Sequence, residues 1–162
     1  MADIVDSTTR SRIMSRIRGK NTSPELTLRR ALYRQGFRFT LHDNSLPGCP
    51  DVKFTGRRAV IFVHGCYWHR HRGCHWCTTP ASRQDFWGPK LEGNARRDAK
   101  NIELLRTAGW RVGIVWECAL RPQWRDDTVH AVAHWLRSRQ GLFETAVLRS
   151  RNVRPANSAP TA

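Results

Sequence analysis

The sequence predicts an α/β protein in which one β-sheet is flanked by helices. Two observations support this fold class: the order of the periodic segments, and a length of 162 residues, which suits one compact domain. The segments read as a helix, three strands, a helix, a strand and a last helix, and such an order typically forms a sheet covered by helices. We expect a basic arm over residues 1–22, a domain over 23–140 and a disordered tail over 141–162.

The first half of the domain carries one helix and three strands. A helix is predicted to begin at Ser23, a common capping residue followed by proline and an acid, and to end at Gly36. Alternating residues predict a strand at 37–41, and a second strand opens at Asp51. The apolar run AVIFV (59–63) is typical of a strand at the centre of a sheet.

The second half continues with a helix over about 89–108, which begins at a proline and carries alanine, isoleucine and leucine on one face. The segment WRVGIVW (110–116) predicts a further strand, and a last helix runs over about 127–139. The chain after Gln140 is rich in arginine, serine, alanine and proline, which predicts disorder.

The charge of the chain points to a polyanionic partner. Lysine and arginine number 28 against 13 acidic residues, a formal net charge of +15, which favours binding to nucleic acid through counterion release. The arm combines arginines with the apolar residues Ile13, Met14 and Ile17, so it is expected to dock on the domain or on DNA. No apolar run is long enough to span a bilayer and the N-terminus lacks a secretory pattern, so a cytoplasmic location is expected.

The stretch VHGCYWHRHRGCHWC (63–77) holds three of the five cysteines and four of the seven histidines. Cysteines clustered in this way indicate metal binding rather than a disulfide framework. The spacing of Cys66, His71 and Cys74 supplies three ligands for a structural zinc ion. Two residues compete for the fourth place: Cys77, which would complete a local site, and Cys118, which follows the strand 110–116.

A second pattern resembles the beginning of a divalent-metal nuclease. The pair Pro50-Asp51 opens a strand, and the strand 59–63 is followed by His64. A hard carboxylate ligand at such a place suits Mg²⁺, which can activate a water for attack on phosphorus. The acid-x-Lys half of that nuclease pattern is absent, since Phe62-Val63-His64 stands in its place.

Taken together, six segments resemble the very short patch repair (Vsr) endonucleases, which are bacterial DNA mismatch nickases. They are SRIRGKNTSPE, LPGCPD, VIFVHGCYWHRHRGC, TTPASRQDFW, NARRD and GWRVGIVWEC, and they span about residues 10 to 120. The resemblance implies a restriction-endonuclease-like mixed sheet between helices. It also implies cleavage on the 5′ side of the thymine in T:G mismatches, which arise when 5-methylcytosine deaminates.

The resemblance implies a catalytic site with bound Mg²⁺. Asp51 would be the direct ligand and the backbone carbonyl of Val63 would complete the site, with His69 as the general base. Three further residues would surround the metal and its waters or orient that network: Glu25, His64 and Asp98.

The resemblance also assigns the structural zinc ligands, and it selects Cys118 as the fourth. The set is Cys66, His71, Cys74 and Cys118. His75 and Cys77 stand close by as alternative ligands. The residues implied to form an aromatic wedge that enters the DNA stack are Tyr67, Trp68 and Trp87.

The implied partner is double-stranded DNA with a T:G mismatch, bound by a monomer associated with the bacterial nucleoid, and mismatch-repair proteins are further candidate partners. Two other functions fit part of the sequence. A zinc-stabilised DNA-binding protein without catalysis would explain the charge and the cysteines but leave Asp51, His64 and His69 without a role. An RNA-binding protein would rest on the charge alone.

Overall fold

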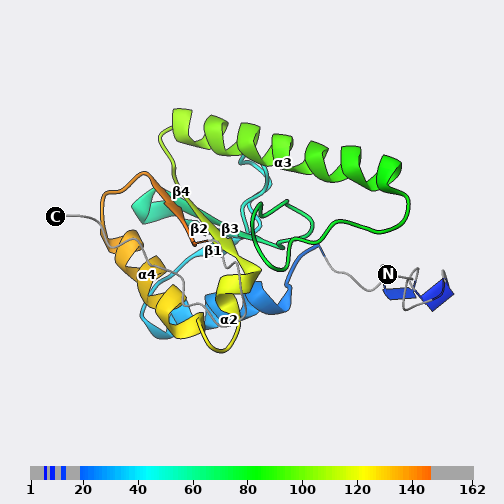
Figure 1. Ribbon diagram of the computed structural model, residues 1–162. Coiled ribbons are helices and arrows are strands. Elements are labelled where there is room, and N and C mark those ends of the chain that lie inside the picture. The colour runs from blue at the N-terminus through cyan, green and yellow to red at the C-terminus, as the bar shows by residue number, and fades with distance from the viewer. Residues whose placement is uncertain (1–5, 7, 10–11, 14–18, 147–162) are drawn as a thin grey trace.

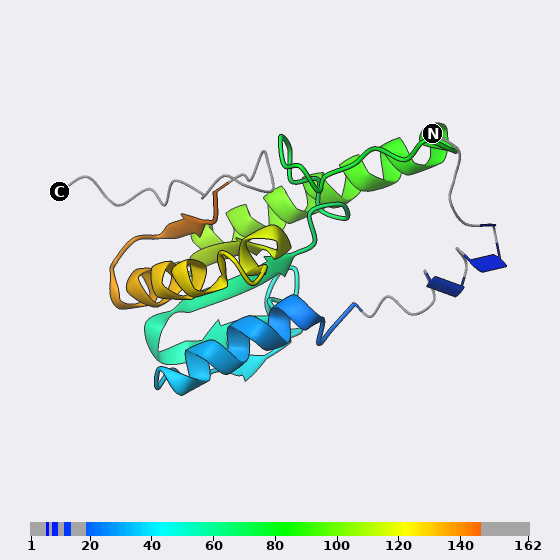
Figure 2. The ribbon, with the colours of Figure 1, turned by 60° about the horizontal axis from the view of Figure 1, so that its bottom comes forward.

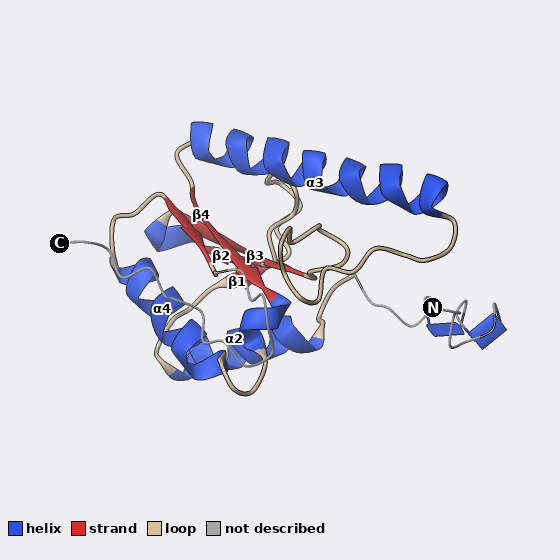
Figure 3. Ribbon diagram, viewed as in Figure 1, coloured by secondary structure: helices blue, strands red, loops and turns tan. Residues whose placement is uncertain are grey.

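The computed structural model describes residues 6, 8–9, 12–13 and 19–146. Its centre is a five-stranded sheet in the order β1-β2-β3-β4-β5, with α2 and α4 on one face and α3 on the other (Figures 1 and 3). The pairs β1–β2 and β2–β3 are antiparallel, whereas β3–β4 and β4–β5 are parallel. The mixed sheet flanked by helices that the sequence predicts is therefore confirmed.

Three helices and five strands make up this arrangement. The helices are α2 (Ser23–Arg34), α3 (Gln84–Thr107) and α4 (Arg125–Arg137). The strands are β1 (Thr40–Leu41), β2 (Val52–Phe54), β3 (Ala59–His64), β4 (Arg111–Trp116) and β5 (Leu142–Glu144). In this described part of the chain, no helix is both long and apolar enough to cross a membrane.

Helix α2 begins as the sequence predicts, but its cap is Thr22 rather than Ser23. The Thr22 hydroxyl accepts from the Glu25 amide at 3.5 Å and donates to the Glu25 carboxylate at 2.9 Å. Thr22 and Glu25 have the spacing of a capping box, although the glutamate accepts from the Thr22 hydroxyl and the Asn21 amide rather than from the Thr22 amide. The cap therefore fixes the backbone and the side chain of Glu25 at the same time.

Two predicted elements differ in their limits. The strand predicted at 37–41 is paired only at Thr40–Leu41, because Phe37 and Phe39 turn edge-on to Phe54 in the core. Helix α3 starts at Gln84, ahead of the predicted proline start, and Pro89 lies inside it. Pro89 is the sixth residue of α3, so it cannot donate to the Asp85 carbonyl and its ring crowds that oxygen, a local cost that the rest of the long helix tolerates.

The largest difference lies after Gln140, where disorder is predicted. Residues 142–144 form β5, which pairs in parallel with β4 from Leu142↔Val112 to Glu144↔Ile114. The Thr145 hydroxyl then accepts from the amide of Trp116 at 3.0 Å. The prediction is wrong for this segment because an edge strand depends on its neighbour more than on its own composition.

The core has two halves, one on each face of the sheet. Helices α2 and α4 lie side by side over one face (Figure 2) and bury Leu28, Leu32 and Trp135 there. Gly113 in β4 permits this packing, since a Cβ at that position would lie 2.9 Å from the Trp135 ring. Helix α3 covers the other face and continues past the sheet above the loop that follows β3 (Figure 1).

Most of the predicted arm lies outside the described residues, including Met14 and Ile17. Ile13 is described, and its side chain is 49% exposed. The role of the arm in binding DNA, and the boundary predicted between the arm and the domain, therefore stay predictions.

Candidate catalytic site and metal cluster

The parallel pairing of β3 and β4 brings two distant cysteines together. The pairing ends at His64↔Trp116, and a cysteine follows each strand at the same offset, Cys66 after β3 and Cys118 after β4. Because parallel strands end at the same edge of a sheet, Cys118 reaches the loop that contains the other predicted ligands.

Four buried side chains form what we call the Cys/His cluster: Cys66, His71, Cys74 and Cys118. Their ligand atoms all lie within 4.8 Å of one another. His71 Nδ1 lies 3.4 Å from Cys66 Sγ and 3.6 Å from Cys118 Sγ, and the Trp76 amide donates to Cys74 Sγ at 3.4 Å. Three sulfurs and one imidazole in this arrangement fit the ligand set of a structural zinc ion. Cys77 is not one of the four.

The state of His71 also fits a ligand role. Burial lowers its pKa to about 4, so the ring is neutral at physiological pH, the form that binds a metal. The ring stacks on Trp116 with centroids 4.1 Å apart. Trp116 also meets His64 edge-on at 5.3 Å, so this tryptophan separates the Cys/His cluster from the predicted catalytic residues.

The predicted base His69 lies beside Asp98 and His64. Its Nδ1 is 2.7 Å from Asp98 Oδ2, and its ring stacks on His64 with centroids 4.0 Å apart. Since a carboxylate accepts the hydrogen bond, Nδ1 carries the proton and Nε2 keeps the lone pair. Burial lowers the pKa of His64 to about 3, so its ring is neutral.

Asp51 directly precedes β2, and its side chain reaches the end of β3, the neighbouring strand that the sequence analysis placed beside it. Its Oδ2 accepts from the amide of Val63 at 2.7 Å. Burial raises the pKa of Asp51 to about 7 against the opposing effect of this hydrogen bond, and the nearby Glu25 carboxylate raises it further. A buried carboxylate in this state gains stability when a cation binds beside it.

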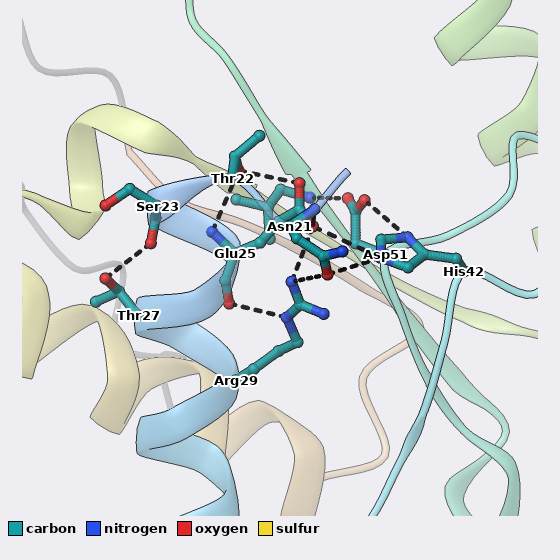
Figure 4. A network of polar contacts seen from close by, with 9 residues as sticks. Asn21, Thr22, Ser23, Glu25, Thr27, Arg29, His42 and Asp51 are labelled. Carbon is teal, nitrogen blue, oxygen red and sulfur yellow. Dashed lines mark hydrogen bonds and ion pairs between the residues drawn. The ribbon is translucent and has the colours of Figure 1, made fainter. Parts of the chain in front are cut away.

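Glu25 and His42 complete what we call the carboxylate site, with Asp51 (Figure 4). The His42 ring lies between the acids, with Nε2 3.9 Å from Glu25 Oε2 and Nδ1 3.8 Å from Asp51 Oδ1. Sequence reasoning missed His42, although it follows the predicted strand 37–41 directly. The antiparallel pairing of β1 with β2 is what places this histidine. Since the end of β1 lies opposite the start of β2, the residue after β1 lies next to Asp51.

A cavity of about 730 Å³ joins these groups. Its lining includes the carboxylate site, the histidine pair with Asp98, and two aromatic rings, Trp68 and Trp87. Tyr67 is not part of that lining, but its ring contacts both tryptophans edge-on, at centroid distances of 5.1 and 6.5 Å. The cavity therefore combines hard oxygen ligands, a base and stacking surfaces.

The amino-acid sequence is similar to those of several DNA-nicking enzymes. A family model described as DNA mismatch endonuclease Vsr matches residues 2–76. The type II nicking enzyme V.XorIIP of Xanthomonas oryzae pv. oryzae is 47% identical over 120 residues, which cover 74% of this chain and 88% of that one. The DNA mismatch endonuclease Vsr of Escherichia coli K12 is 47% identical over 121 residues, or 75% and 77% of the two chains.

The chain belongs to the Vsr family. The resemblance seen in the sequence is therefore confirmed, and membership of the Vsr family supports a DNA mismatch endonuclease function. The type II nicking enzyme V.NmeAIP of Neisseria meningitidis serogroup A is a further relative, 40% identical over 121 residues that cover 75% of this chain and 86% of that one.

In this member of the Vsr family, one further cavity residue escaped the sequence analysis. Glu117 lines the cavity, and its Oε1 accepts from the amide of Cys66 at 2.9 Å. It directly precedes Cys118, so the same strand end supplies a ligand of the Cys/His cluster and a carboxylate of the cavity. No local motif distinguishes this glutamate from a surface acid, and only the pairing of β3 with β4 reveals it.

Proposed function

We propose that the protein nicks DNA on the 5′ side of the thymine in T:G mismatches, by Mg²⁺-dependent hydrolysis, with zinc in the Cys/His cluster. One observation carries the proposal: a single cavity is lined by Asp51, by the His69–Asp98 pair and by two tryptophans. A DNA-binding protein without catalysis, the alternative, has no use for this combination.

The chain's own residues supply distinct steps. When bound, Mg²⁺ would be held by Asp51 and the carbonyl of Val63, with Glu25 and His64 around it, and would neutralise phosphate charge and acidify water. Asp98 holds the His69 ring so that Nε2 can take the proton of the attacking water. The neutral His64 ring, stacked on His69, limits the rotation of that base.

The three aromatic rings, Tyr67, Trp68 and Trp87, supply mismatch recognition. Opening a base stack costs a few kcal/mol per step, and the cost is lower at a mispaired base. Base–aromatic stacking returns about 1–3 kcal/mol per base. The Trp68 carbonyl accepts from Asn94 Nδ2 at 3.1 Å, and Cys66 and His71 flank the loop, so the rings start from a fixed position.

The direct test is a nicking assay on matched duplexes that differ only in a T:G or T:A pair, with Mg²⁺ or with EDTA. Each strand carries its own label, and a panel of surrounding sequences covers the unknown context preference. We expect Mg²⁺-dependent nicking of the thymine strand in T:G duplexes. DNA binding without nicking in every context would instead support the alternative function.

Replacing His69 by alanine should slow nicking on the order of 100-fold or more, the usual contribution of a general base. Asp98→Asn keeps the His69 ring but weakens the hydrogen bond that orients it, so it should cause a smaller loss of nicking rate. Single-turnover rates at saturating enzyme measure both effects. A His69→Ala protein with a wild-type rate would exclude the imidazole as the base.

Replacing Trp68 by alanine should sharply reduce nicking of T:G duplexes while zinc content stays normal. The double variant Tyr67→Ala/Trp68→Ala should lose most of the preference for T:G over T:A. Tyr33→Ala is the matched control, because that ring is 56% exposed and lies outside the cavity. If these rings only pack the loop, the double variant will lose stability and keep its discrimination.

A further inference from the structure

A buried arginine, Arg29, lies next to the carboxylate site and has no part in the function proposed above. Its side chain is only 7% exposed, a position that arginine occupies when it is paired. Its Nη2 donates to Glu25 Oε2 at 3.2 Å and to Asn21 Oδ1 at 2.9 Å, and its Nε donates to the Glu25 carbonyl at 3.3 Å (Figure 4). One guanidinium therefore joins two segments of the chain.

The two segments are helix α2, which carries Glu25, and the junction between the arm and α2, which carries Asn21. Asn21 adopts the left-handed conformation (φ 58°), and its amide donates to Glu25 Oε2 at 2.9 Å. The Glu25 carboxylate thus accepts from Asn21, from the Thr22 hydroxyl and from Arg29. Since a carboxylate has about four lone-pair sites, these donors determine its position and leave about one site for the cavity.

The remaining neighbour, His42, does not hold Glu25 in this way. Its ring nitrogens lie 3.9 Å from Glu25 Oε2 and 3.8 Å from Asp51 Oδ1, beyond the range of a hydrogen bond. The two acids face the same ring, so a positive charge beside either of them lowers their mutual repulsion. Arg29 is always charged and supplies that positive charge at the Glu25 side.

We propose that Arg29 is a positioning residue that couples the junction of the DNA-contacting arm to the ion site. This proposal depends on the proposed function, because it takes Glu25 and Asp51 to be residues of the ion site. A movement of the arm on DNA would displace Asn21 and with it the Glu25 carboxylate, both directly through the Asn21 backbone amide and through the Arg29 guanidinium. Arm placement and ion binding then affect each other reciprocally.

The test uses the full-length protein and Tb³⁺ as a probe of the ion site, with luminescence excited through the tryptophans of the cavity. Asp51→Ala defines the background signal. We expect Arg29→Gln to weaken Tb³⁺ binding about 10- to 100-fold, the usual effect of a residue that orients a metal site. In nicking assays kcat should fall by a similar factor while KM for DNA changes little. Arg30→Gln, a change at the exposed neighbour on the same helix, should alter neither.

Two further variants separate positioning from loss of fold. Arg29→Lys keeps the positive charge but lacks the planar set of guanidinium donors, so it should recover only part of the Tb³⁺ affinity. Asn21→Gly removes the Oδ1 acceptor that Arg29 shares with His42 Nε2 and tolerates the left-handed backbone, so it should weaken Tb³⁺ binding while the protein stays folded. These two variants decide the question if Arg29→Gln does not fold.

Wild-type Tb³⁺ affinity in Arg29→Gln would overturn the proposal, and wild-type affinity in Asn21→Gly would overturn the coupling of the arm junction through Arg29. If the proposed function is wrong, the experiments give a different pattern of results. In that case the wild-type protein does not nick T:G duplexes, and the Tb³⁺ titrations still report on Arg29 independently.

Discussion

Replacing Asp51 by alanine is expected to abolish nicking of T:G duplexes and to leave DNA binding largely intact. The Asp51 carboxylate lies in the cavity and is held against the central strand β3, because it accepts a hydrogen bond from the Val63 amide. Its loss would remove the proposed hard ligand for Mg²⁺, whereas the net charge of +15 spread over the chain would still support affinity for DNA. A nicking assay and a DNA-binding titration on the same preparation measure the two properties separately.

The matched control for this variant is Asp126→Ala, which removes a carboxylate whose side chain is 80% exposed. It should nick at the wild-type rate. The Asp51→Ala protein should also remain folded, because removing a buried carboxylate relieves its desolvation and the repulsion from Glu25. Near-normal nicking by purified Asp51→Ala would remove this residue from the mechanism.

Replacing Cys118 by serine is expected to lower both zinc content and stability. A structural zinc ion contributes on the order of 10 kcal/mol to the folding of small zinc domains, which is comparable to the whole stability of a typical protein. Losing one of four ligands should therefore lower the melting temperature by about 10 °C or more. Metal analysis of the purified protein and thermal unfolding with and without a chelator give the two measurements.

Cys77→Ser is the control for Cys118→Ser, since it makes the same chemical change beside the Cys/His cluster. Cys77 is partly buried, but its thiol is not one of the four ligand atoms within 4.8 Å. Zinc content and melting temperature should stay close to the wild type. If Cys77 is essential and Cys118 dispensable, the zinc site is local to the loop 63–77 and the ligand assignment fails.

Short-range patterns predicted the elements that depend on neighbours in the chain. The start of α2, the apolar strand β3 and the triplet Cys66, His71 and Cys74 were all visible, because capping residues, apolar runs and ligand spacing are patterns of a few residues. The family resemblance added Glu25 and Asp98 to the candidate site. It did not identify His42 or Arg29, which carry no motif of their own.

Local patterns in the chain specify which chemical groups are available: a carboxylate at a strand start, histidines after an apolar strand, soft ligands in a loop, and many basic side chains. Which of these groups lie close together depends on how the strands pair and the helices pack. The parallel pairing of β3 with β4 places Cys118 rather than Cys77 in the Cys/His cluster, and the packing of α3 in the fold brings Asp98 to His69. Strand pairing and helix packing depend on burial summed over the whole domain, so no local spacing can specify them.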